Sequence, residues 1–221
     1  MEETIESTLE NANSLHPHII TTVIAPPPFS SLPSNECWLD IVYELPASVF
    51  VDPNQLHDLA DFRNARVFGE TDLEAPLEHV REPRGSLVIV RRKNRDDRRT
   101  FKLDLPIHLR YQHPSYNATH RSIRISPPKA GVTCGFGLPA IQHPLLPRYA
   151  AVASFTPFNV TTQEYDLELA VPVGRQEDAT LVQIGTFVTV LACSAWIIWA
   201  ILQSIKKTKR REAKGKRRKS Q

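Results

Sequence analysis

Residues 100–111 read TFKLDLPIHLRY, and this stretch decides the class of fold. Every second residue from 101 to 109 is apolar, whereas Lys102, Asp104 and Arg110 lie at positions between the apolar ones. A period of two residues is typical of a β-strand that buries one of its faces. We therefore expect an antiparallel strand here, with Pro106 marking a sheet edge or a bulge.

Similar alternating or β-branched runs predict further strands along the chain. They span residues 19–24, 38–45, 86–92, 121–125 and 166–171. The chain has 18 prolines and only 8 glycines, a balance that disfavours long helices and glycine-rich phosphate loops. The expected fold is therefore an all-β domain with antiparallel strands, a sandwich or jelly roll.

One short segment of this domain has the pattern of a helix. Residues 53–63 carry apolar side chains roughly on one side. Asp52 precedes the segment as an N-cap, and Pro53 occupies its first position. We expect one short helix there.

A long apolar segment lies near the C-terminus. Residues 181–202 read LVQIGTFVTVLACSAWIIWAIL, 22 residues without a charge or a proline. At about 1.5 Å per residue, such a helix reaches about 33 Å, enough for a hydrocarbon core of about 30 Å. Trp196 and Trp199 lie toward its basic end, where indoles favour the membrane interface. We expect a single transmembrane helix.

The charges are distributed unevenly about this span. Residues 203–221 contain ten Lys or Arg and one Glu, whereas residues 1–202 carry a net charge of −6. Basic flanks remain in the cytosol, so we expect a luminal N-terminus and a cytosolic C-terminus. A tail-anchored protein with a cytosolic β domain is the alternative, and it would require the basic tail to cross the bilayer.

These features divide the chain into four parts. We expect a disordered acidic lead over residues 1–15, a luminal β domain over 16–180, the transmembrane helix over 181–202 and a basic tail over 203–221. The first twenty residues hold four glutamates and no apolar core, so they do not form a secretory signal. Either the hydrophobic helix directs insertion itself, or the sequence begins late.

Two kinds of residue bear on the luminal assignment. Asn117 and Asn159 each begin an N-x-[ST] triplet, which is either a glycosylation site or an unmodified surface residue. Cys193 lies inside the span, which leaves Cys37 and Cys134 as one disulfide or as two free thiols. A bridge over that separation would contribute about 4 kcal/mol.

The basic tail allows more than one function. Arg218 and Lys219 stand fourth and third from the C-terminus, which resembles a dibasic retrieval signal to the endoplasmic reticulum. A stop-transfer anchor attracted to anionic lipid is the second interpretation, and a nucleic-acid patch is the third. The tail has no interleaved aromatic residues for base stacking, so we expect no nucleic-acid partner.

The motifs of common enzyme classes are missing. The chain has no G-x-S-x-G, Walker loop, G-x-G-x-x-G, H-E-x-x-H, C-x-x-C or Asp-x-Asp. His16 and His18 lie two apart, but without a neighbouring Cys or carboxylate we interpret them as a surface pair. We expect no catalytic residue, no metal, no cofactor and no small-molecule substrate.

Four segments together resemble the PIG-X family, the small subunit of GPI mannosyltransferase I. Residues 37–56 read CWLDIVYELPASVFVDPNQL, residues 73–76 LEAP, residues 105–111 LPIHLRY and residues 171–174 VPVG. They occur in the order of the family's motifs, and LPIHLRY is the strongest match. The chain departs from the family pattern at Asn54 and Gln55, where an aromatic–acidic pair is usual.

The resemblance implies a non-catalytic subunit in the endoplasmic reticulum membrane. It would stabilise a separate polytopic catalytic subunit, PIG-M-like, which adds the first mannose to the GPI-anchor precursor. Gly185, Thr186 and Thr189 would offer small groups where a partner helix can pack, although such rows also occur in spans that bind nothing.

Two other functions compete with this one. A general luminal chaperone or cargo receptor would keep the same topology and bind many clients weakly. An enzyme with a site assembled from Asp104, His108 and Arg110 is the third hypothesis.

Overall fold

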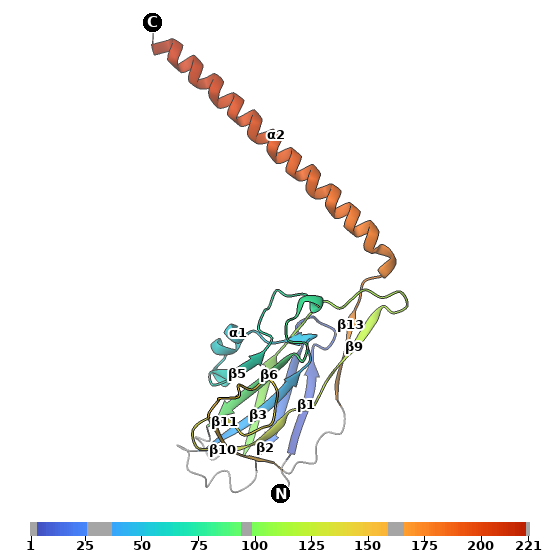
Figure 1. The fold of residues 1–221 in the computed structure, drawn as a ribbon, viewed down its shortest axis with the longest axis vertical. Coiled ribbons are helices and arrows are strands. Elements are labelled where there is room, and N and C mark those ends of the chain that lie inside the picture. Colours follow the sequence, from blue (N-terminus) through green and yellow to red (C-terminus); the bar gives the residue numbers. More distant parts are fainter. Residues whose placement is uncertain (1–3, 26–36, 94–98, 159–165, 220–221) are drawn as a thin grey trace. The chain divides into compact units, whose positions relative to one another are not determined.

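The computed structural model describes residues 4–25, 37–93, 99–158 and 166–219, the side chains only as far as residue 210 (Figure 1). The chain divides into two compact units. The β unit comprises Met1–His113 and Ala118–Val173, and the helical unit comprises Pro114–Asn117 and Gly174–Gln221. The expectation of an all-β domain followed by one long apolar helix is confirmed.

The larger sheet of the β unit has six strands in the order β11-β12-β10-β3-β6-β5. In chain order these strands are β3 (Cys37–Leu45), β5 (Arg66–Gly69), β6 (Ser86–Arg92), β10 (Lys129–Cys134), β11 (Leu138–Pro139) and β12 (Val152–Pro157). Strand β3 pairs antiparallel with β6 on one side and with β10 on the other. Only the short β11 runs parallel to its neighbour β12.

The second sheet has the order β1-β2-β7, formed by β1 (Thr4–Glu10), β2 (His18–Ile24) and β7 (Thr100–Pro106). Strand β1 corrects the expectation that residues 1–15 are disordered. Ile5 and Ser7 are buried, whereas Glu6 and Glu10 face solvent. The acidic residues that suggested disorder therefore occupy the exposed face of an edge strand, whose backbone pairs with β2 along its whole length.

The predicted strand over residues 100–111 is interrupted at Ile107. Pro106 ends β7, an edge strand as expected, and the chain continues as β8 (His108–Leu109). Ile107 and Leu109 donate their backbone N–H groups to the carbonyls of Pro17 and Leu15, at 3.0 and 2.9 Å. Strand β8 also pairs with β4 (Val49–Phe50). Residues 107–109 therefore lie between the residues that precede β2 on one side and strand β4 on the other.

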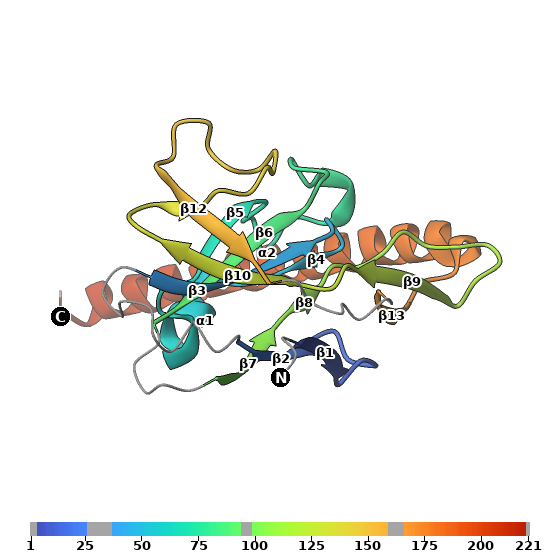
Figure 2. The ribbon, with the colours of Figure 1, turned by 90° about the horizontal axis from the view of Figure 1, so that it is seen from below.

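The main core lies between the two sheets, which form separate layers in Figure 2. Ile19 and Leu103 from the three-stranded sheet join Ile41 and Val88 from the six-stranded sheet in one buried cluster. A smaller cluster on β3 and β6, formed by Val42, Leu87 and Ile89, is covered by residues of the 138–150 segment. The arrangement is a β-sandwich. A separate pair, β9 (His120–Ile125) and β13 (Leu167–Pro172), adds Ile123 and Leu169 to the main core.

The predicted helix over 53–63 is divided into two pieces. Asp52 caps α1 (Pro53–Asp58) by accepting the N–H of Asn54 at 2.8 Å. Leu59 then adopts an extended conformation, with φ −82° and ψ 126°, before a 3₁₀ turn at Ala60–Phe62. A second 3₁₀ turn lies at Leu77–His79.

The helical unit contains α2 (Ala179–Lys219), which follows a 3₁₀ turn at Gln176–Asp178. The stretch Gln176–Arg210, which comprises this turn and α2 as far as Arg210, is long and apolar enough to span a membrane, with a mean hydropathy of 2.0 in its most apolar window. The predicted span of 181–202 lies inside this helix. The basic tail is not separate from it, because Lys and Arg are good helix formers and the tail contains no proline.

Candidate functional site

Three of the four segments that resemble the PIG-X motifs, 37–56, 73–76 and 105–111, meet around one buried side chain, Arg110. Its side chain lies 4.5 Å above the Phe50 ring of β4. Its Nη2 donates to the carbonyl of Asp72 at 2.7 Å, and its Nη1 donates to the carbonyl of Ala75. Arg110 is only 4% exposed, so the LPIHLRY segment uses its arginine to hold the LEAP segment in place.

A second charged group, Glu70, organises the rest of the 70–82 loop. Its carboxylate accepts the backbone N–H groups of Asp72 and Arg81, both at 2.8 Å, and that of Glu82 at 3.3 Å. These hydrogen bonds, led by the one from Asp72, and the positive charge of Arg110 hold the pKa of Glu70 below its ordinary value. The loop is thus folded around one carboxylate and one guanidinium.

His108 lies beside the Phe50 ring and forms a small imidazole cluster with His16. Its ring stacks on Phe50 with centroids 5.2 Å apart. Its Nε2 lies 2.9 Å from Oε1 of Gln55, and its Nδ1 lies 2.8 Å from Nδ1 of His16. Burial, and then the neighbouring His16, lower the pKa of His108. A neutral His108 that donates to Gln55 and accepts from His16 satisfies both contacts.

The structure separates the three residues of the enzyme hypothesis into different contacts. Asp104 pairs with His18 at 2.6 Å, His108 contacts Gln55 and His16, and Arg110 binds loop carbonyls. The functional groups are therefore engaged in structural contacts. Among the described residues, no three His, Cys, Asp or Glu side chains are grouped so that they could hold a metal ion.

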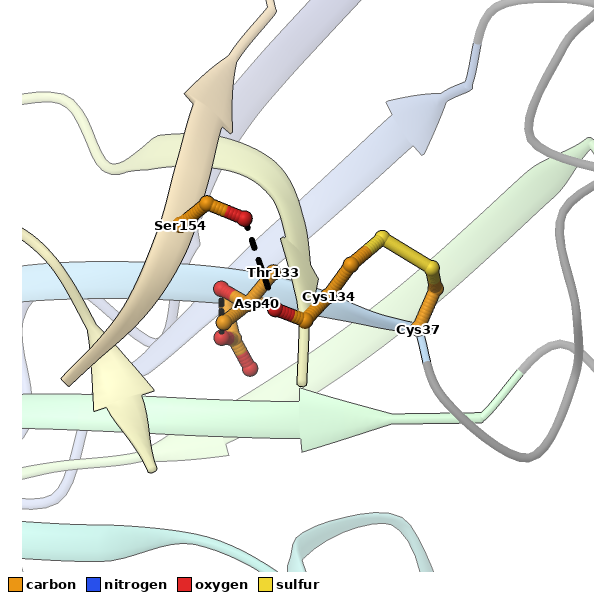
Figure 3. The surroundings of a disulfide bond; sticks show 5 residues. All are labelled: Cys37, Asp40, Thr133, Cys134 and Ser154. Carbon is orange, nitrogen blue, oxygen red and sulfur yellow. Dashed lines mark hydrogen bonds between the residues drawn. A yellow bond between two sulfur atoms is a disulfide. The ribbon is translucent and has the colours of Figure 1, made fainter. Parts of the chain in front are cut away.

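Cys37 and Cys134 lie directly opposite each other on β3 and β10 and are joined by a disulfide in the structure. Figure 3 shows the bond beside Asp40 and Thr133, with Ser154 donating its hydroxyl to the Cys134 carbonyl at 3.4 Å. The Thr133 hydroxyl donates to the carboxylate of Asp40, which is fully buried. The bridge links two neighbouring strands at the end of their ladder.

The remaining predicted site residues lie outside this cluster. Asn117 is exposed in the helical unit, and Asn159 lies outside the described residues. Gly185, Thr186 and Thr189 are exposed on α2, where the Thr189 hydroxyl donates to the Gly185 carbonyl at 2.8 Å.

Arg218 and Lys219 form the last residues of α2. Their side chains lie outside the described part of the chain, and their role as a retrieval signal stays a prediction.

Sequence reasoning missed two members of the site, Glu70 and Gln55. Glu70 lies three residues before the LEAP segment, and nothing in its neighbourhood distinguishes it from a solvated carboxylate. In the sequence Gln55 is marked only by its departure from the family pattern, and in the structure it contacts His108. Only the folded chain brings these residues to the LPIHLRY segment.

The fold defines a class of protein: a β-sandwich unit joined to one helix that is long and apolar enough to span a membrane. The chain belongs to the PIG-X / PBN1 family, whose model matches residues 12–202. This match confirms the resemblance found in the sequence, and it covers the β unit after strand β1 and the apolar part of α2.

A similar human protein is named "GPI alpha-1,4-mannosyltransferase I, stabilizing subunit". It is 26% identical over 179 residues, which cover 76% of this chain and 68% of the human protein. Its name describes a stabilising subunit and not a catalytic one, as the resemblance implied. No solved structure matches this chain.

Proposed function

We propose that this protein stabilises the catalytic subunit of GPI mannosyltransferase I, which adds the first mannose to the GPI-anchor precursor. The observation that carries the proposal is the family match over residues 12–202, together with the name of the human relative. The partner in this proposal is a polytopic, PIG-M-like subunit that supplies all of the catalytic groups. The chain contributes a binding surface and a membrane helix.

The proposed location is the membrane of the endoplasmic reticulum, with the β unit in the lumen and the C-terminus in the cytosol. The strongly basic residues after the apolar part of α2 favour this orientation. The Cys37–Cys134 disulfide suits the oxidising lumen. Arg218 and Lys219 would act there as a retrieval signal, and replacing both by Ser would then release the protein to later compartments.

The contacts of the motif residues support a stabilising role. His108, Arg110 and Glu70 are engaged in holding the 70–82 loop and β4 in place. Beside them, Tyr111 of the LPIHLRY segment is 78% exposed. A rigid surface that presents an aromatic side chain is suited to binding another protein.

The proposal is tested by purifying the tagged full-length protein from its own membranes in mild detergent. We expect a mannosyltransferase subunit to co-purify in near-equal amount, and its level to fall when this protein is depleted. GPI-anchored proteins should decrease selectively. A broad loss of secreted proteins with many weakly bound clients would instead support the chaperone or cargo-receptor function, and absence of any mannosyltransferase would refute the proposal.

A further inference from the structure

A groove of about 920 Å³ opens on the β unit at one end of the six-stranded sheet. Its wall includes Trp38 of β3, Arg66 of β5, Lys93 just after β6 and Phe136 between β10 and β11. None of these residues belongs to the Arg110 cluster. The groove is therefore a second feature of the β unit, and neither the motif contacts nor the family match explains it.

The charge of the groove is positive. Arg66, Arg91 and Lys93 line it, and no Asp or Glu is among the lining residues that the structure describes. Arg91 is neutralised, because its Nε and Nη2 each donate to the carboxylate of Asp40 at 2.8 Å. Arg66 and Lys93 make no ion pair within the described part of the chain. Two cationic side chains of the groove thus have no carboxylate partner among the described residues and can pair with an anionic ligand.

The groove also presents aromatic surface. Lys93 lies 4.7 Å from the Trp38 ring centroid, so the ammonium group and the indole share one side of the wall. Phe136 is 99% exposed. Aromatic residues and arginine are enriched where proteins bind other proteins.

The position of Phe136 is fixed by its neighbours. Gly135 and Gly137 have φ values of 101° and 126°, which disfavour any residue with a side chain. A Cβ on Gly137 would lie 2.4 Å from the Ala151 carbonyl oxygen. Nη1 of Arg91 donates to the Gly137 carbonyl at 2.6 Å, which ties the loop to the buried Asp40–Arg91 pair. The loop therefore holds an apolar ring in water at a defined place.

We infer that this groove binds an acidic peptide segment of the mannosyltransferase partner. Carboxylates of the segment pair with Arg66 and Lys93, and an apolar side chain packs between Trp38 and Phe136. The inference rests on the proposed function for the identity of the partner. The charge of the wall selects an anion, and the two aromatic rings favour a peptide with apolar side chains over an isolated anionic headgroup.

Photo-crosslinking tests the occupant directly. p-Benzoylphenylalanine is placed at position 136 of the full-length protein in its own membranes, and at position 102 as a control, because Lys102 is exposed on β7 of the other sheet. We expect position 136 to capture an acidic peptide of the mannosyltransferase subunit, and position 102 not to do so. Crosslinks from position 136 to lipid alone, to unrelated proteins or to nothing would overturn the inference.

Charge reversal tests the contribution of the two cations. The double variant Arg66→Glu with Lys93→Glu is compared with Lys102→Glu plus Arg124→Glu, which alters two exposed cations elsewhere on the β unit. We expect the first variant to recover about tenfold less partner than wild type, since each like-charge contact opposes binding. The control variant should recover the wild-type amount.

The outcomes distinguish the inference from the proposed function. If wild type itself recovers no mannosyltransferase, the proposed function fails. If wild type recovers it and the groove variant does so equally, only the groove inference fails. Should the double charge reversal prevent folding, Phe136→Ala replaces it, because this side chain is almost completely exposed. That variant should lower recovery of the partner with no change in unfolding midpoint, and unchanged recovery would overturn the inference.

Discussion

Arg110 connects residues that are far apart in the chain. Its guanidinium contacts the Phe50 ring and the carbonyls of Asp72 and Ala75. Replacing Arg110 by Ala would leave these two carbonyls without their donors and Glu70 without its positive neighbour. We expect a loss of about 3 kcal/mol in the free energy of unfolding, measured by urea denaturation of the detergent-solubilised protein.

Two variants serve as controls for Arg110. Arg110→Lys should recover only part of the loss, because an ammonium group cannot reproduce the planar fork that reaches both carbonyls. Arg124→Ala, on the exposed side of β9, should leave the unfolding free energy unchanged. Equal stability of Arg110→Ala and wild type would contradict the role assigned to this side chain.

Glu70 makes the β unit sensitive to acid. Its pKa in the folded protein lies below the ordinary value of 4.5, chiefly because the Asp72 N–H donates to the carboxylate. At a pH between the folded and the unfolded pKa, Glu70 binds a proton in the unfolded chain but not in the folded one. The stability that Glu70 contributes is therefore fully present above the unfolded pKa. It is lost as the pH falls through the folded pKa.

The corresponding variant is Glu70→Gln, which cannot accept all three backbone N–H groups. We expect it to be less stable than wild type by about 1–3 kcal/mol at neutral pH. The difference should shrink as the pH falls below 4.5. Unfolding midpoints measured across this range check the prediction, and a difference that stays constant with pH would refute it.

At the scale of elements, the Cys37–Cys134 bridge joins β3 to β10 across a separation of 97 residues. On the loop-entropy argument, replacing both cysteines by Ser would lower the free energy of unfolding by about 4 kcal/mol. Denaturation of the double variant measures this loss. Identical mobility of wild type on reducing and non-reducing gels, together with a full set of reactive thiols, would show that the bridge is absent.

Helix α2 offers Gly185 for a test of helix packing. A Cβ at this position meets no atom of the chain within 4 Å, so a larger side chain disturbs nothing in the described structure. Gly185→Leu should nevertheless reduce recovery of the catalytic subunit if a partner helix packs against this face. Val190→Leu, elsewhere on the exposed surface of α2, is the matched control. Unchanged recovery from both variants would exclude Gly185 from the interface.

At the scale of the whole molecule, the orientation across the membrane is the main prediction. Asn117 is exposed and begins the triplet Asn117-Ala118-Thr119, so a luminal location of residues 1–180 makes it accessible to the glycosylation machinery. We expect endoglycosidase treatment to increase the gel mobility of wild type. In the Asn159→Gln background, adding Asn117→Gln should abolish any remaining shift.

A protease-protection assay provides the independent control for orientation. Protease added to sealed microsomes should remove a C-terminal tag and leave the β unit intact. Digestion of the β unit together with an unshifted wild-type band would instead place it in the cytosol, as in the tail-anchored alternative.

The sequence determined the features that depend on neighbouring residues. Alternation over 101–109 identified a strand with one buried face, and the uncharged run of 181–202 identified a helix fit to cross a membrane. Both signals are local: the first depends on the alternating side-chain direction of a strand, and the second on an unbroken run of uncharged residues. The motif segments likewise identified the family without the fold.

Tertiary structure decided the features that depend on distant contacts. Strand β1 exists because β2 supplies its hydrogen bonds, although its glutamates suggested disorder. The Arg110 cluster and the groove each gather residues from separate elements, and no local pattern marks which positions will meet. Their geometry follows from the pairing of strands and the packing of two sheets, which a linear sequence does not display.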